Sequence, residues 1–350
     1  MRNLWIRGVR PVSLMVILAL LLVSCAPAKP TPTPAPTKIT VGYMPTIAWA
    51  NTFVAIEKGY FAEQGLEVEP QRFNSGALMM APLATGELDV GAGQNAPSLF
   101  NAIAKGMDIK VVGAQASCPT GHNGIVILVR KDLFDSGEVD TIAELRGRKV
   151  VTNVLKAFGD YFWAMALAKE GLTLDDVEMV AMPFPEVPAA FENKAIDASI
   201  MPEPLGVRAV GMGMATVLVT ADQVFPGVQV NDIFFGKNIL LDNPDVGKRF
   251  MMAFLKGARD LQGDQWKSEE NLNAISKYTG LDVEILKKVP DTATFYWDPN
   301  GEPNLESIME MQQFYLDQGY LEYSELLPVE KLYDSSFVEY ALEQLSRYSE

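Results

Sequence analysis

The chain contains few side chains that could carry out metal or nucleophilic chemistry. Its only histidine is His122, and its only cysteines are Cys25 and Cys118. A zinc site needs several such ligands, and a serine triad would need His122 as its base. His122 lies near Gly121 and Gly124 in a turn-like segment, which predicts a loop residue. We therefore expect no catalytic residue, no metal site and no cofactor, which leaves binding as the expected role.

The residues ahead of Cys25 have the order of an export signal. Three arginines precede an apolar run from Val12 to Val23, and Ser24-Cys25 follows. The run is short for a bilayer span, so residues 1–24 are predicted to be a cleaved signal peptide. The pattern resembles a bacterial lipobox, which implies that the Cys25 thiol receives a diacylglycerol and that Cys25 begins the mature protein. An ordinary secretory signal with a chance cysteine is the alternative.

A tether and an acidic body are expected to follow the signal. Residues 26–37 read APAKPTPTPAPT, a composition that favours an extended polyproline conformation of about 37 Å. With Cys25 they form a predicted lipidated tether, residues 25–37. Loss of the signal removes three arginines and no acidic residue, which takes the formal net charge from −15 to −18. Such a charge repels a phosphate backbone, so we expect no nucleic-acid partner.

Two successive α/β units are predicted by the alternation of strands and helices. The first has strands near 38–42, 66–69, 88–91 and 109–112, with helices at 53–59, 77–85 and 97–105. The second has strands near 125–129, 149–152, 177–181, 198–200 and 217–219, with helices at about 160–169 and 186–193. This alternation predicts parallel sheets covered by helices on both faces. From about residue 245 the chain is helical, and we expect this segment to pack back on the first unit.

Five short motifs, in this order, resemble those of bacterial solute-binding proteins for nitrate, sulfonates, taurine and thiamine-type pyrimidines. They are residues 55–66 (AIEKGYFAEQGL), 83–91 (LATGELDVG), 145–150 (LRGRKV), 175–177 (DDV) and 196–198 (IDA), the last followed by Glu203-Pro204. The resemblance covers most of residues 38–245 and implies an α/β fold of the type II periplasmic binding protein class. Two doubly wound lobes, joined by a two-strand hinge, would hold the ligand between them. The implied lobes are residues 38–126 with 233–350, and residues 127–232.

The resemblance also implies a role in an ABC importer. The sequence has no G-x-x-x-x-G-K-[ST] motif, so the permease and ATPase subunits would be separate polypeptides. We expect a monomer outside the cytoplasm, held to the cell membrane by its N-terminal lipid. A metal-free enzyme on the same fold and a sensor lobe for a membrane protein are the other interpretations.

The candidate ligand-binding residues follow from a rule of open α/β sheets, whose ligands bind beyond the carboxyl ends of the strands. The candidates carry aromatic rings, amides or carboxylates in the loops after predicted strands: Tyr43, Trp49, Asn74, Gln94, Asn95, Gln115, Phe158, Tyr161, Phe184, Glu203 and Asn231. Rings can stack on a flat ligand, and amides can match its hydrogen-bond pattern.

Positive charge is scarce near these loops, where Arg72 and Lys156 are the basic side chains. The set therefore favours a planar heterocycle of low charge, such as a thiamine-type pyrimidine or a riboflavin-like flavin. A small anion held by backbone N–H groups, such as a sulfonate, taurine or nitrate, is the alternative. For each single residue, packing in the core or at the rim competes with ligand contact as the explanation.

Overall fold

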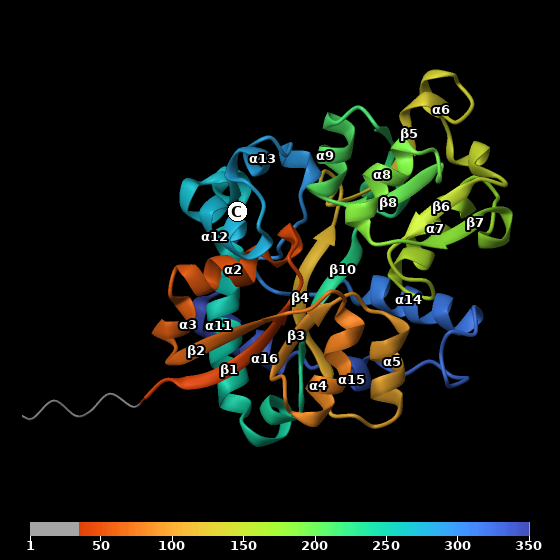
Figure 1. The fold of residues 1–350 in the computed structure, drawn as a ribbon. Coiled ribbons are helices and arrows are strands. Elements are labelled where there is room, and N and C mark those ends of the chain that lie inside the picture. The colour runs from red at the N-terminus through yellow and green to blue at the C-terminus, as the bar shows by residue number, and fades with distance from the viewer. Residues whose placement is uncertain (1–34, 350) are drawn as a thin grey trace, which may run out of the picture. The chain divides into compact units, whose positions relative to one another are not determined.

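Two five-stranded sheets form the framework of residues 35–349, which are the residues that the structure, a computed structural model, describes (Figure 1). Sheet A has the order β2 (Leu66–Arg72), β1 (Thr37–Tyr43), β3 (Val90–Gly93), β10 (Val228–Phe235) and β4 (Lys110–Cys118). Sheet B has the order β7 (Glu178–Ala181), β6 (Lys149–Thr152), β8 (Ala198–Pro202), β5 (Ile125–Arg130) and β9 (Ala215–Thr220). The prediction of two α/β units is confirmed. Cys25, the signal peptide and residues 26–34 of the tether lie outside the described residues.

Both sheets are mixed, so the prediction of parallel sheets is wrong for one strand in each. β1 and β2 pair in parallel from Thr37 and Leu66 to Tyr43 and Arg72. β10 runs antiparallel to β3 and β4, and β5 runs antiparallel to β8 and β9. Each reversed strand is the one that the chain enters directly from the other sheet. Strand direction therefore depends on these long-range connections, which local alternation does not encode.

The chain passes between the sheets twice, in residues 119–124 (the first crossing) and residues 221–227 (the second crossing). The crossings hydrogen-bond to each other: the N–H of Gly121 donates to Oδ2 of Asp222 over 3.0 Å, and the N–H of Asp222 donates to Oδ1 of Asn123 over 3.0 Å. The lobe boundaries expected after residues 126 and 232 fall inside β5 and β10. Because a whole strand belongs to one sheet, we propose that the lobes divide in the crossings.

Helices cover both sheets. They are α2 (Ala50–Glu57), α3 (Tyr60–Glu63), α4 (Met80–Thr85), α5 (Pro97–Ala104), α6 (Lys131–Asp135), α7 (Phe158–Ala168), α8 (Val187–Glu192), α9 (Leu205–Gly211), α10 (Ala221–Val224), α11 (Pro244–Arg259), α12 (Glu269–Thr279), α13 (Val283–Lys287), α14 (Leu305–Asp317), α15 (Val329–Leu332) and α16 (Ser336–Leu345). A 3₁₀ turn, Ile47–Trp49, precedes α2. None of the helices in residues 35–349 has both the length and the apolar character to cross a bilayer.

Local signals in the sequence account for several helix ends. Gly86 ends α4 in the left-handed conformation with φ of 82°, as the sequence predicts for a glycine cap. Thr141 and Glu144, spaced as in the capping-box pattern, form a capping box at the start of the 3₁₀ turn Ile142–Leu145. The C-terminal helices pack on the sheet A unit as expected, α11 against α2 and α16 against β4, while α14 also contacts α7 of the sheet B unit (Figure 1).

The contact between α11 and α2 is close because Gly257 has no side chain. A Cβ atom at position 257 would lie 2.2 Å from the backbone oxygen of Asn51 and 2.9 Å from Cβ of Ala55. Phe250 and Phe254, on the same helix, are fully buried. The close approach of the two helix backbones therefore allows α11 to pack tightly against the core of the sheet A unit.

We predict that Gly257→Ala destabilises the protein by about 1–3 kcal/mol, because the added methyl group must push the two helix backbones apart. Gly211→Ala is the matched control, since a Cβ at position 211 would meet no atom of residues 35–349 within 4 Å. The control should leave stability unchanged or raise it by up to about 1 kcal/mol. Urea unfolding followed by circular dichroism measures both variants, and equal stabilities would contradict the close-packing argument.

Candidate ligand-binding site

A cavity of about 60 Å³ lies between the two sheets. Residues from both sheets line it: Met44, Thr46, Ala48, Trp49, Gln94, Ile125, Asn153, Phe158, Phe184, Ile200, Met201, Pro202, Val230, Asn231 and Phe295. Most of them stand at strand ends or in the segments that follow, which is where the strand-end rule places a ligand. Water needs about 10–15 Å³ per molecule in such a volume, so the cavity has room for about five waters.

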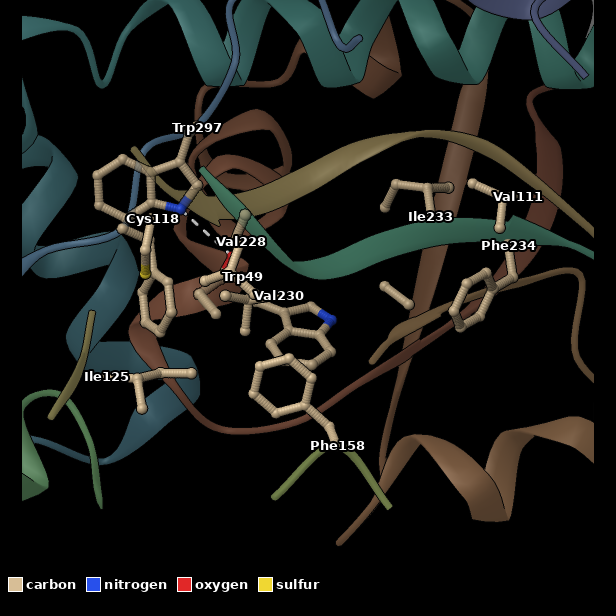
Figure 2. Close-up of a cluster of buried hydrophobic side chains, with 14 of the residues drawn as sticks. Trp49, Val111, Cys118, Ile125, Phe158, Val228, Val230, Ile233, Phe234 and Trp297 are labelled. Atoms are coloured by element: carbon tan, nitrogen blue, oxygen red, sulfur yellow. Dashed lines mark hydrogen bonds between the residues drawn. The ribbon is translucent and has the colours of Figure 1, made fainter. Parts of the chain in front are cut away.

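Aromatic rings supply much of the cavity wall. Trp49 ends the 3₁₀ turn before α2, and Phe158 is the first residue of α7. Figure 2 shows both rings reaching into the same region, with Ile125 nearby. Phe184 and Phe295 complete the aromatic set. Flat, apolar walls of this kind suit a planar ligand, on which rings can stack.

The polar groups of the cavity are amides, a hydroxyl and an indole N–H. The amides belong to Gln94, Asn153 and Asn231, and Thr46 supplies the hydroxyl. Nε1 of Trp49 is buried and has no hydrogen-bond partner among the described residues. A buried donor without a partner is costly, so this N–H is available to an acceptor on a ligand. No charged side chain belongs to the lining set that the structure describes.

Five of the sequence-predicted residues line this cavity, namely Trp49, Gln94, Phe158, Phe184 and Asn231. Thr46 and Asn153, in the same predicted loops, line it as well. The strand-end rule therefore brought residues from both sheets to one place, although whether each touches a ligand stays a prediction.

The other six predicted residues lie outside the lining. Tyr43 packs edge-on against Phe53 at 5.5 Å between ring centroids, and Asn74 is exposed after β2. Gln115 is fully buried in β4. Tyr161 belongs to an aromatic cluster, with its ring centroid 5.5 Å from that of Phe314. A side chain after a strand end can turn into the core instead of the cavity, and sequence position does not distinguish the two directions.

Asn95 and Glu203 are the remaining two. Both are buried, form hydrogen bonds within the protein, and follow a lining residue in the chain. Nδ2 of Asn95 donates to Oδ2 of Asp232 over 2.5 Å, and Oε2 of Glu203 accepts from the N–H of Val207 over 2.8 Å. The N–H of Glu203 also donates to the carbonyl of Gly124, which ties the end of β8 to the first crossing. Both side chains therefore hydrogen-bond within the protein, one position along the chain from a lining residue.

Sequence reasoning missed eight lining residues: Met44, Ala48, Ile125, Ile200, Met201, Pro202, Val230 and Phe295. Most are apolar residues in or beside strands, where a cavity wall and an ordinary core have the same sequence signature. Phe295 comes from the helical C-terminal region, far along the chain from the other lining residues. A hydrophobic residue in an irregular segment there gives no signal of its position.

Two buried carboxyl groups flank the cavity without lining it. Burial raises the pKa of Asp232 to about 7, against the opposing effect of hydrogen bonds from Asn95 and Gln229. Burial likewise raises the pKa of Glu203 to about 7, opposed by the N–H of Val207. Both groups therefore hold a proton more firmly in the folded protein than in the unfolded chain.

Comparison with known proteins identifies the fold and the family of relatives. The model of the NMT1-like family matches residues 32–276. A putative binding protein of Brucella abortus is 28% identical over 254 residues, which cover 71% of this chain and 74% of that protein. The riboflavin-binding protein RibY of Chloroflexus aurantiacus is 26% identical over 309 residues, covering 82% and 84% of the two chains.

Solved structures of periplasmic binding proteins share the arrangement of the two sheets. The nitrate-binding protein NrtA of Synechocystis PCC 6803 superposes with a TM-score of 0.75 at 18% identity, covering 89% of each chain. The expected type II periplasmic binding protein fold is thereby confirmed.

The raised pKa of Asp232 predicts a pH dependence of stability. An unfolded aspartate titrates near about 3.9, so between about pH 4 and pH 7 the folded protein binds more protons than the unfolded chain. Stability then falls as pH rises through this window, by at most about 1.4 kcal/mol per pH unit for one group. In Asp232→Asn this fall should be smaller. The new amide can still pair, because Oδ1 of Asn95 has no partner among the described residues.

Urea unfolding at pH 4.5 and pH 7.5 tests this difference in slope. Asp245→Asn, at a highly exposed position on α11, should keep the wild-type slope. An unchanged slope in Asp232→Asn would show that Asp232 does not hold its proton in the folded state.

Proposed function

Since this chain belongs to the NMT1-like family and is a solute-binding protein of an ABC importer rather than an enzyme, we propose that it carries a planar heterocycle of low charge. A thiamine-type pyrimidine or a riboflavin-like flavin would sit in the cavity between the sheets. The observation that carries the proposal is the make-up of the cavity lining, which combines aromatic rings and amides and has no charged side chain among its described residues.

The rings of Trp49 and Phe158 supply flat apolar surfaces from opposite sheets, Trp49 from the sheet A unit and Phe158 from the sheet B unit. A planar ligand between them would gain stacking and burial from both units at once. The N–H of Trp49 and the amides of Gln94 and Asn231 could pair with ring nitrogens and carbonyl oxygens at the ligand's edge. RibY, a relative named for binding riboflavin, is consistent with a ligand of this kind.

An anionic ligand is the less favoured alternative. The nitrate-binding neighbour shares the fold at 18% identity, which supports the arrangement of the sheets and not the identity of the ligand. A nitrate or sulfonate ion transferred into this cavity would lose its hydration and meet no cationic side chain among the described lining residues. Backbone N–H groups would have to supply all of the compensation.

The size of the cavity indicates how a ligand would enter. Space for about five waters is too small for a three-ring flavin, so the two sheet units must separate for loading. The crossings, which are the direct covalent links between the sheets, would act as the hinge. Ligand contacts with both units would then favour the closed arrangement by their differential affinity for it.

The protein acts outside the cytoplasm, and we propose that a lipid on Cys25 holds it at the cell membrane. The tether after Cys25 would let the body load its ligand and reach the permease without diffusing away. Pairing with a permease and an ATPase follows from the importer role, since the sequence carries no phosphate-binding loop of its own.

Ligand binding can be tested with riboflavin, an aminopyrimidine of the thiamine type, nitrate and taurine, through thermal shift and through quenching of flavin or tryptophan fluorescence. We expect stabilisation by a heterocycle and none by nitrate or by the sulfonate group of taurine. Trp49→Ala should weaken binding about tenfold or more, because stacking and burial are both lost. Trp49→Phe keeps a ring and removes the N–H, so its loss should be smaller, about fivefold.

Tyr340→Ala is the matched control for these variants, because Tyr340 lies on α16 beneath the Lys248 ammonium and away from the cavity lining. It should bind as the wild type does. If only nitrate or taurine stabilised the protein, the result would contradict the heterocycle proposal and favour the small-anion alternative. If Trp49→Ala and the wild type bound the ligand with equal affinity, the ligand would not bind in this cavity.

Lipidation can be tested by metabolic labelling with a fatty acid in a bacterial host. The wild type should incorporate the label and fractionate with membranes, whereas Cys25→Ser should do neither. Cys118→Ala controls for thiol loss, since Cys118 is fully buried and should not affect labelling. An unlabelled wild type would favour the ordinary secretory signal.

A further inference from the structure

A second cavity of about 300 Å³, which we call the chamber, lies beside the first crossing. His122 of the first crossing lines one part of it, Gln262 and Asp264 after α11 line another, and the segment 291–297 lines a third. The chamber is five times as large as the cavity between the sheets. The two differ in character as well, because hydroxyl, amide, imidazole and carboxyl groups contribute to the chamber lining.

Phe295 borders both the cavity and the chamber, so the two spaces have a common wall. Its ring occupies room left by Gly124, where a Cβ would lie 2.4 Å from Cδ1 of Phe295. Backbone hydrogen bonds in both directions between Tyr296 and Ser117 attach this segment to the end of β4. Gly124 begins the stretch leading into β5, so the common wall stands at the first crossing, where the units would move on opening.

The chamber is rich in hydrogen-bond acceptors. Nδ1 of His122 is buried and has no hydrogen-bond partner among the described residues, and the ring lies 5.3 Å from that of Tyr296. Burial lowers the pKa of His122, partly offset by a hydrogen bond to the Phe295 backbone, so the imidazole is neutral near pH 7 and can accept through a ring nitrogen. Asp264 adds a carboxylate at the rim.

No lysine or arginine belongs to the chamber lining in the part of the chain that the structure describes. Lys267, which follows the chamber-lining Trp266, is bound by Asp291, with 2.7 Å between Nζ and Oδ1. The chamber thus suits a group that donates hydrogen bonds, such as a hydroxyl or amino group, and opposes an anionic one.

We propose that the ligand occupies both spaces, with its planar ring in the cavity between the sheets and a flexible side chain bearing hydroxyl or amino groups passing beside Phe295 into the chamber. This inference rests on the proposed function and narrows it to a two-part ligand. The volumes are consistent with this division, because the chamber of about 300 Å³ has ample space for a chain of several polar atoms. The ring still requires the separation of the two sheet units, since the cavity of about 60 Å³ is too small for it.

The test compares riboflavin with lumiflavin, which has the same ring but a methyl group in place of the polyhydroxyl chain. Riboflavin should bind about tenfold more tightly or better, as expected for several hydrogen bonds of the side chain. His122→Phe keeps the ring contact with Tyr296 and removes the acceptor, and Asp264→Asn removes the charge. Each should weaken riboflavin about three- to tenfold and leave lumiflavin unchanged. Asp245→Asn, on the exposed face of α11, is the control and should change neither.

His122 also provides a direct reporter, because it is the only histidine in the sequence and its imidazole gives one set of side-chain NMR signals in untagged protein. Riboflavin should shift that set, and lumiflavin should leave it in place. Equal affinities for the two flavins, or a His122 signal unmoved by bound riboflavin, would overturn the two-part ligand while leaving the ring site intact. If neither flavin binds the wild type, the proposal of a flavin ring site is contradicted, and so is the proposal of a two-part ligand that depends on it.

Discussion

The position of β10 in the middle of sheet A is the constraint on which the rest of the structure depends. The chain returns from sheet B through the second crossing and inserts β10 between β3 and β4, antiparallel to both. All eight residues of this strand are buried. The strand completes sheet A, and its residues Val230 and Asn231 form part of the cavity lining. Without it, β1 to β3 and β4 would not form one sheet, and sheet A would lose one of its two links to sheet B.

A buried polar network allows such a strand to carry Gln229 and Asp232 in its interior. Nε2 of Gln229 donates to Oδ1 of Asp232 over 2.9 Å, and Oε1 of Gln229 accepts from the N–H of Asn304 over 2.9 Å. The N–H of Gln229 donates to Oγ of Ser307, near the start of α14. Helix α14 also contacts α7, whose first residue is the cavity-lining Phe158. The network that holds β10 therefore also helps to position the ring of Phe158. Buried hydrogen-bond networks of this kind restrict motion, and removal of one partner would leave another buried polar group unpaired at a cost in stability.

The sequence predicted the α/β alternation, the C-terminal helices on the sheet A unit, and five of the fifteen residues now found at the cavity. Trp49 and Phe158 were accessible to the strand-end rule because each follows a recognisable strand. β10 was not predicted as a strand, since Asn231 and Asp232 interrupt the apolar pattern that a central strand usually shows. Its stability comes from partners distant in sequence, as does the position of Phe295. Information of that kind is held in tertiary contacts and not in any local window.

The distribution of charge bears on which ligands the cavity can accept. The chain has a formal net charge of −15, and several of its cations are committed to local ion pairs, such as Lys58 with Asp260 at 2.8 Å and Arg130 with Asp197 at 3.1 Å. The acidic surface produces a negative electrostatic potential at the cavity. No cation among the described lining residues offsets this potential. A closing site with apolar walls strengthens that field, because low-dielectric surroundings screen it less than water does. An anion would bind against both a large desolvation cost and this potential, whereas a neutral ring with a hydrogen-bonding chain has a smaller desolvation cost and is not repelled by the potential.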